Sequence, residues 1–197
     1  MVVGLYIFIG LAVYAVLSII VIVIGVKVAR ARGWSPWKGG LLAAIIMYLA
    51  LFWDQIPIHL AHKYYCSTEG GLTIYKTLEE WKKENPGVAE TIVPAGTVKS
   101  VKIGAKERYP LNQRFAWDII TSEKLLGIRK RDEQIVDVDT GEVIARYIDF
   151  DSNQTMREPK EFRDFKIWIY MESCEIPRHK SERNKFSTLK HLVKYGD

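Results

Sequence analysis

Charged side chains are scarce in the first 58 residues of this 197-residue chain. Only five occur there, namely Lys27, Arg30, Arg32, Lys38 and Asp54. The rest of the chain carries nearly all of its lysine, arginine, aspartate and glutamate, so the average composition describes neither part. The composition therefore divides the chain near residue 59 into an apolar part and a polar part.

A concentrated basic surface is also lacking. The pI is about 9.1 and the formal net charge is +5, but residues 1–58 contribute +3 of that charge and the longer polar part only +2. No arginine-rich run is present. Because phosphate contacts need a dense basic face, we expect no nucleic-acid partner.

Motifs of the common enzyme classes are missing. The chain has no G-x-S-x-G, P-loop, G-x-G-x-x-G, H-E-x-x-H or C-x-x-C pattern. Carboxylates are plentiful, but those most available for acid–base work are expected at hairpin ends, where solvated and turn-forming acids are common. They are Asp137, Asp139, Glu142, Asp149 and Asp151. A membrane-anchored enzyme stays an alternative, whose catalytic residues the sequence does not identify; we predict no cofactor and no metal.

The first apolar segment, residues 2–26, is 25 residues long and carries no charge. As a helix it would extend about 37 Å, enough to cross a hydrocarbon core of about 30 Å with some tilt. The sequence therefore predicts a transmembrane helix over about residues 2–27. The alternative is a cleaved signal peptide, which would have a basic start and a shorter apolar stretch.

The second apolar segment, residues 39–58, follows Ser35 as a candidate N-cap and Pro36 at the first helical position. Tryptophans flank it as the two interfaces of a bilayer favour: Trp34, Trp37 and Trp53. Residues 1–60 are thus predicted to form a transmembrane helical hairpin with a basic loop at 27–38. A buried helical hairpin of a soluble protein is the alternative.

The orientation follows from the distribution of positive charge. Four basic residues lie in the loop 27–38, whereas only Lys63 and Lys76 follow the second segment closely. Positive loops stay in the cytoplasm. We therefore expect a two-helix cell-membrane protein with a cytoplasmic loop and both termini outside.

The two cysteines, Cys66 and Cys174, both fall on the side expected to be oxidising, which favours a disulfide. Two unpaired, buried cysteines are one alternative. Another is a metal site, because His59, His62 and Cys66 form an H-x2-H-x3-C pattern, although no fourth ligand is evident. A bonded pair would exclude the metal site.

The residue hardest to explain by packing is Asp54, which lies 15 positions into the second apolar segment. A charge at the centre of a bilayer costs up to about 3 kcal/mol, and less towards the interface. Pro57 cannot donate to the carbonyl of Trp53, and Gln55 and His59 are four apart, so polar groups gather here. Asp54, Gln55, Pro57 and His59 are therefore a candidate contact with a membrane partner; an interfacial carboxylate is the alternative.

Residues 61–176 are predicted to form an α+β domain with a mainly antiparallel meander of about five strands. Thr77 and Glu80 have capping-box spacing, which predicts a short helix over residues 75–85. Alternating apolar and polar residues then predict strands. The predicted strands are residues 98–103, 115–120, 125–129, 134–138, 143–150 and 165–172.

The last of these strands, residues 165–172, is predicted to carry Cys174 just beyond its end. Its apolar set should face the core, which leaves Trp168 and Tyr170 partly exposed as candidates for a partner surface. Ordinary half-buried aromatic packing is the alternative.

Residues 177–197 are predicted to be a basic amphipathic tail, with apolar residues at helical spacing. It could lie on anionic lipid, dock on a partner, or form a solvated helix that caps the domain. Its basic residues are Arg178, Lys180, Arg183, Lys185, Lys190 and Lys194.

Together these features favour a non-enzymatic integral membrane protein. We expect an accessory or scaffold subunit of a cell-envelope complex, with an extracytoplasmic domain that binds other membrane or envelope proteins. The alternative is a homo-oligomeric ion- or proton-conducting component built around Asp54, because two helices alone cannot enclose a pore.

Overall fold

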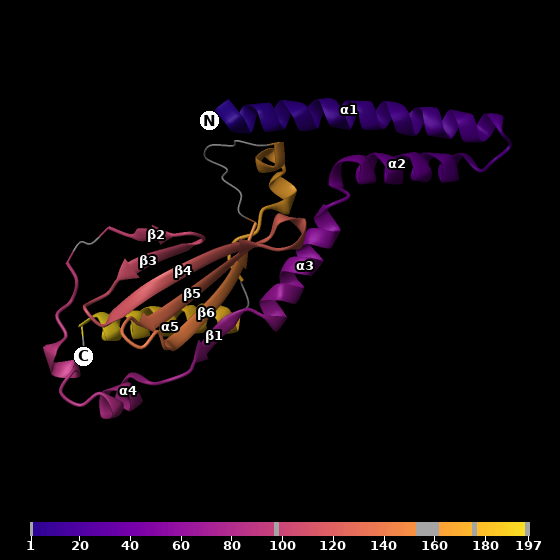
Figure 1. Cartoon of the computed structure of the whole chain (residues 1–197). Coiled ribbons are helices and arrows are strands. Elements are labelled where there is room, and N and C mark those ends of the chain that lie inside the picture. The colour runs from indigo at the N-terminus through magenta and orange to yellow at the C-terminus, as the bar shows by residue number, and fades with distance from the viewer. Residues whose placement is uncertain (1, 97–98, 153–161, 175–176, 196–197) are drawn as a thin grey trace. The chain divides into compact units, whose positions relative to one another are not determined.

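The computed structural model describes residues 2–96, 99–152, 162–174 and 177–195. The chain divides into two compact units, Met1–Pro57 with Gln154–Ile169 and Ile58–Asn153 with Tyr170–Asp197. The predicted combination of helices and one antiparallel sheet is confirmed (Figure 1).

The first unit begins with α1 (Val2–Ala31), a helix that no proline interrupts. Gly33 follows the end of the helix with a φ of +74°, which suits glycine, and the Trp34 N–H donates to the Ala29 carbonyl at 2.9 Å. Within it, Gly4–Ala31 is long and apolar enough to cross a membrane. A signal sequence or the core helix of a soluble protein would pass the same test of length and composition.

The second apolar segment differs from the prediction. A continuous helix over 39–58 is wrong: α2 (Pro36–Phe52) ends before Asp54, and α3 (Gln55–Thr68) begins after it. Pro57 is the third residue of α3, in the first helical turn where its missing N–H is not needed. Since α2 and α3 count as a span only when this bent pair is taken together, the two-helix transmembrane hairpin is not confirmed.

Helices α1 and α2 pack side by side through small residues (Figure 1). A Cβ atom built on Gly25 would lie 2.8 Å from the Gly39 carbonyl oxygen, and one on Gly39 would lie 2.5 Å from the Gly25 carbonyl oxygen. The Tyr14 hydroxyl also donates to the Met47 carbonyl. The two backbones approach so closely because these positions carry no side chain.

The second unit is built on a six-stranded antiparallel sheet with the order β1-β6-β5-β4-β3-β2. Its strands are β1 (Gly71–Ile74), β2 (Val101–Ile103), β3 (Lys106–Pro110), β4 (Phe115–Glu123), β5 (Arg129–Asp137) and β6 (Val143–Asp151). Strands β2 to β6 pair consecutively, as the predicted meander does, and β1 adds beside β6. Short 3-10 turns occur at η1 (Ala89–Thr91), η2 (Leu125–Gly127), η3 (Phe162–Phe165) and η4 (Ile167–Ile169).

Two strand predictions are wrong. Residues 125–129 and 134–138 were expected as separate strands, but Arg129–Asp137 is one strand because its polar centre finds partners on the sheet. Arg131 Nε lies 2.9 Å from Glu133 Oε1, and Arg146 pairs with Asp132 across to β6. Residues 165–172 form no strand but the turns η3 and η4, where the Ile169 N–H bonds the Lys166 carbonyl at 3.1 Å.

The predicted short helix is confirmed as α4 (Leu78–Glu84). The Thr77 N–H donates to Glu80 Oε2 at 2.8 Å and the Glu80 N–H donates to Thr77 Oγ1 at 3.2 Å, a complete capping box. Helix α5 (Pro177–Tyr195) packs on one face of the sheet and contributes to the core between them. The core contains the buried side chains of Trp81, Leu111, Phe115, Ile135, Ile144, Ala145, Tyr147, Phe186 and Val193.

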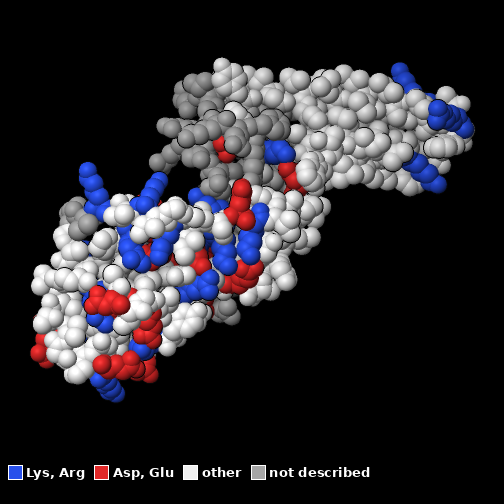
Figure 2. Space-filling model, in the orientation of Figure 1, with Lys and Arg blue, Asp and Glu red and all other residues white. Residues whose placement is uncertain are grey.

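The opposite face of the sheet is polar. Figure 2 shows acidic and basic side chains interspersed over this part of the molecule. Arg108 binds Asp118 with its Nε and Nη2 atoms, each at 2.7 Å, and Lys106 reaches the same carboxylate at 3.1 Å. Such cross-strand pairs allow a sheet face to meet solvent without a covering layer.

Candidate functional site

Asp54, the first candidate, lies in the turn between α2 and α3 and is only 8% exposed. Lys166 Nζ lies 2.6 Å from its Oδ2 atom, and Trp168 Nε1 donates to Oδ1 at 3.2 Å. Both donors come from the segment that contains η3 and η4. The carboxylate therefore has partners within its own chain, which the sequence reasoning did not foresee.

The Trp168 indole that bonds Asp54 belongs to a cluster of aromatic rings. The Trp168 ring lies 4.7 Å from that of Phe52, and Phe52 stacks on Tyr48 at 5.4 Å. Gln55, another residue of the predicted partner contact, accepts a hydrogen bond from the Tyr48 hydroxyl at 3.0 Å. Trp168, a predicted surface residue, is half-buried here. We call Asp54, Lys166 and Trp168 the turn clamp.

The predicted disulfide is present. Cys66 near the end of α3 is bonded to Cys174 across 108 residues, with 5.7 Å between the Cα atoms. His62 lies one helical turn before Cys66, with Nε2 3.0 Å from the Phe150 carbonyl oxygen and 3.6 Å from Cys66 Sγ. The bond fixes α3 to the segment that follows the sheet.

The same three side chains bear on the metal alternative. Ligand atoms of His62, Cys66 and Cys174 lie within 4.8 Å of one another. Cysteine binds zinc as a thiolate, however, and the disulfide uses both sulfur atoms. His62, moreover, is occupied with the Phe150 carbonyl, so the arrangement fits a structural disulfide better than a metal centre.

A cavity of about 670 Å³ opens beside the disulfide. Its lining combines α3 with the chain after η4: His59, His62, Lys63, Cys66, Tyr170, Met171 and Glu172. The predicted partner residues His59 and Tyr170 are therefore brought together in the second unit. Gln55 and Pro57, from the same predicted set, belong to the first unit.

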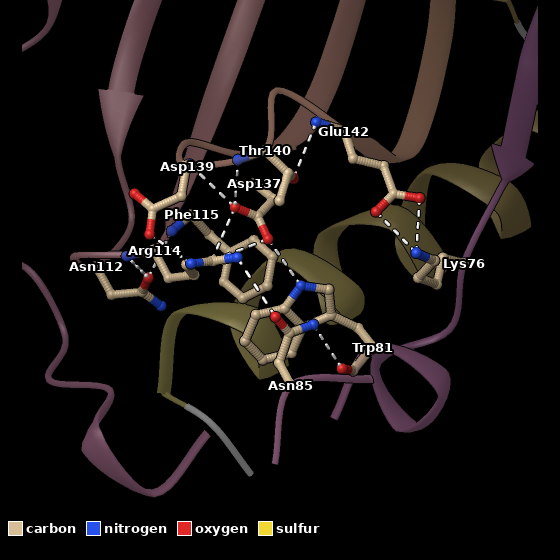
Figure 3. Close-up of polar contacts among 10 residues, drawn as sticks. All are labelled: Lys76, Trp81, Asn85, Asn112, Arg114, Phe115, Asp137, Asp139, Thr140 and Glu142. Carbon is tan, nitrogen blue, oxygen red and sulfur yellow. Dashed lines mark hydrogen bonds and ion pairs between the residues drawn. The ribbon is translucent and has the colours of Figure 1, made fainter. Parts of the chain in front are cut away.

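The hairpin carboxylates are engaged in ion pairs. Asp137 is fully buried and accepts hydrogen bonds from Trp81 Nε1 at 2.8 Å and Arg114 Nε at 2.9 Å (Figure 3). The N–H groups of Asp139 and Thr140 donate to its other oxygen at 3.0 and 3.3 Å. Burial would raise the pKa of Asp137, but these bonds outweigh that effect and hold it below its ordinary value.

The other four predicted acids also have partners within the chain. Figure 3 shows Glu142 with Lys76 and Asp139 with Arg114. Asp151 pairs with Arg129 at 2.7 Å, and Asp149 accepts from the Cys174 N–H at 2.9 Å. These contacts hold the sheet to α4 and to the disulfide, and they give the five acids a structural use.

The basic tail is the helix α5, whose apolar side faces the core. Phe186 stacks on Tyr147 at 5.7 Å, and Val193 is fully buried. Among its basic residues, Lys180 and Lys185 are exposed, Lys190 and Lys194 are half-buried, and Arg183 Nη1 lies 3.3 Å from Asp149 Oδ2. The side chain of Arg178 lies outside the described residues. This packing buries Phe186 and Val193 against the sheet, so these two side chains are not available to insert into lipid.

Comparison with protein-family models, with curated proteins and with solved structures found no match.

Proposed function

We propose that the chain is a non-enzymatic integral membrane protein, an accessory or scaffold subunit of a cell-envelope complex. In this proposal α1 is one span and α2 with the start of α3 is the second. The loop 27–38 is cytoplasmic, and the sheet domain lies outside the cytoplasm and binds a protein partner.

Two observations carry the proposal: the Cys66–Cys174 disulfide of the second unit and the exposed apolar helix α1 of the first. The chain has two cysteines and both are bonded, which suits an oxidising compartment. No residue in the most apolar stretch of α1 is buried, whereas a core helix of a soluble protein would be mostly buried. Phe8, for example, is 72% exposed.

An edge of the sheet supports a protein partner. Strand β2 lies at the end of the sheet order, and its Val101 and Ile103 side chains are 52% and 54% exposed. An edge strand leaves backbone hydrogen-bonding groups unpaired and can accept a strand from another chain. We therefore place the partner contact at β2.

The turn clamp favours this role over ion conduction. A conducting carboxylate must exchange its proton or ion, whereas Asp54 is paired with Lys166 at 2.6 Å and is almost fully buried. The clamp instead fixes the chain at the point where α2 gives way to α3.

Purification of the full chain in mild detergent, followed by cross-linking and mass spectrometry, tests the proposal. We expect envelope proteins that cross-link to the wild type, are lost in Val101→Lys, and persist in Leu125→Lys. Leu125 is a matched control because it is 74% exposed outside β2. A symmetric homo-oligomer would favour the conducting alternative, and a lone monomer would reopen the enzyme alternative.

A further inference from the structure

Helix α5 and the adjacent end of the sheet enclose a groove of about 800 Å³ within the second unit. Its walls come from the loop at 94–96, from β3 and β4, and from the last turns of α5. The lining, drawn wholly from described residues, includes Lys190, His191 and Lys194 but no aspartate or glutamate. Its electrostatic character is therefore positive.

An aromatic wall faces these basic residues. The rings of Tyr109 and Trp117 lie 4.9 Å apart, and Trp117 Nε1 donates to Glu133 Oε2 at 2.9 Å. Glu133 is in turn neutralised by Arg131 at 2.9 Å. The wall is thus held in place by a carboxylate that is itself paired with Arg131.

Lys190 lies against this wall. Its Nζ atom is 3.6 Å from the centre of the Trp117 ring, a cation–π distance. Burial lowers the pKa of Lys190 below its ordinary value. Within the described part of the chain this ammonium contacts the indole and has no carboxylate at ion-pair distance, although the charge of Glu133 partly offsets the effect of burial. A partly buried cation of this kind gains from an anionic partner.

Lys194 supplies a second positive group. It lies one helical turn after Lys190, so both side chains belong to the same side of α5, and like charges at this spacing repel. Its Nζ atom lies 5.4 Å from the ring of Tyr195, which also lines the groove. An anion placed between the two lysines would remove the repulsion.

We infer that this groove binds a soluble organic anion, with its carboxylate or phosphate between Lys190 and Lys194. A ring or similar apolar body of the ligand packs on the aromatic and proline side chains opposite, chiefly Tyr109 and Pro110. Small-molecule sites usually measure about 300–1,000 Å³, so this groove has room for such a body and not only for an ion. The inference does not depend on the proposed membrane topology.

Calorimetric titration of the full chain in a nonionic detergent tests this site with three probes. Phenyl phosphate carries both the charge and the ring, phenyl β-D-glucoside carries the ring alone, and inorganic phosphate carries the charge alone. We expect one phenyl phosphate per chain, bound about tenfold more tightly than either control probe. Added salt should weaken its binding.

Variants locate the binding. Lys190→Gln and Lys194→Gln should each weaken phenyl phosphate binding about tenfold, because each removes one charge-assisted contact. Lys185→Gln is the matched control, an exposed lysine of α5 that does not line the groove, and it should bind as the wild type does. Thermal unfolding without ligand checks each fold, and Lys194→Gln carries the comparison if Lys190→Gln does not fold.

Equal affinity for phenyl phosphate and phenyl glucoside would overturn the inference. So would equal weakening by Lys185→Gln and the two groove variants, because the effect would then reflect net charge alone.

Discussion

Lys166 Nζ lies 2.6 Å from Asp54 Oδ2, although 112 residues separate the two along the chain. Both side chains are largely buried, with 15% and 11% of their surfaces exposed. The Trp168 indole completes the carboxylate's hydrogen bonds. The carboxylate is thereby neutralised at the point where α2 ends and α3 begins.

A double-mutant cycle tests this pairing. Asp54→Asn and Lys166→Gln should each lower the thermal unfolding midpoint in detergent, because each leaves a buried charge without its partner. We expect a coupling energy of about 1–3 kcal/mol, so the double variant should lose less than the sum of the single losses. Lys63→Gln, an exposed lysine of α3, is the control. Strictly additive losses would show that Asp54 and Lys166 have no coupling energy.

The close packing of α1 and α2 makes Gly39 sensitive to size. A Cβ atom there would meet the Gly25 carbonyl oxygen at 2.5 Å, backbone that cannot turn aside. Gly39→Ala should therefore destabilise the helix pair by about 1–3 kcal/mol, measured as a shift in unfolding by sodium dodecyl sulfate in mixed micelles. Gly10→Ala is the matched control, since nothing lies within 4 Å of its Cβ position. Equal behaviour of the two variants would contradict this packing.

The disulfide should dominate the stability of the sheet domain. Cys174→Ser should cost about 2–5 kcal/mol of unfolding free energy, because it releases a long loop in the unfolded chain. Cys66→Ser should match it, and the double variant should lose no more than either single variant. A thiol reductant should lower the unfolding midpoint of the wild type alone. An unfolding midpoint of the wild type that is the same with and without the reductant would show that the bond is not formed in the protein.

The Arg108–Asp118 pair should make the fold sensitive to acid. Burial would raise the pKa of Asp118, but the hydrogen bonds from Arg108 and Lys106 outweigh it and keep the pKa below the ordinary value of 3.8. A carboxyl whose pKa is lower in the folded state stabilises the fold above the unfolded pKa, and this contribution is lost as the pH falls through the folded pKa.

Unfolding free energy should accordingly fall below about pH 4 in the wild type, and Asp118→Asn should flatten that decline. At neutral pH the variant should be less stable by about 1–3 kcal/mol, since its cationic partners lose their carboxylate. Glu123→Gln, at the exposed end of β4, is the control. A pH profile of Asp118→Asn parallel to that of the wild type would assign the acid sensitivity elsewhere.

Local signals in the sequence were sufficient for some of these features. Thr77 and Glu80 stand three apart and predicted the capping box that begins α4, because a cap depends on neighbours along the chain. Cys66 and Cys174 are the only cysteines of the chain, so a disulfide expected from the predicted oxidising side had a single possible pairing.

Features that depend on long-range contacts were not predicted correctly from the sequence. The polar centre of β5 has the composition of a turn, but it is part of a strand in which Asp132 pairs with Arg146 on a neighbouring strand. Residues 165–172 alternate as a strand does, but they form turns, and two of their side chains bond to Asp54. The sequence identified Lys190 only as a basic residue of the tail, because its contact with the Trp117 ring depends on how α5 packs on the sheet. Tertiary contacts set these outcomes, and a local pattern does not contain them.

The location of the sheet domain is the central claim, and paired reporter fusions after Asp197 measure it most directly. Alkaline phosphatase is active only outside the cytoplasm, whereas a green fluorescent protein that matures only in the cytosol reports the opposite side. We predict an active phosphatase and a dark fluorescent protein at this position, and the reverse for fusions in the loop 27–38. A fluorescent fusion with inactive phosphatase after Asp197 would contradict the proposed extracytoplasmic domain.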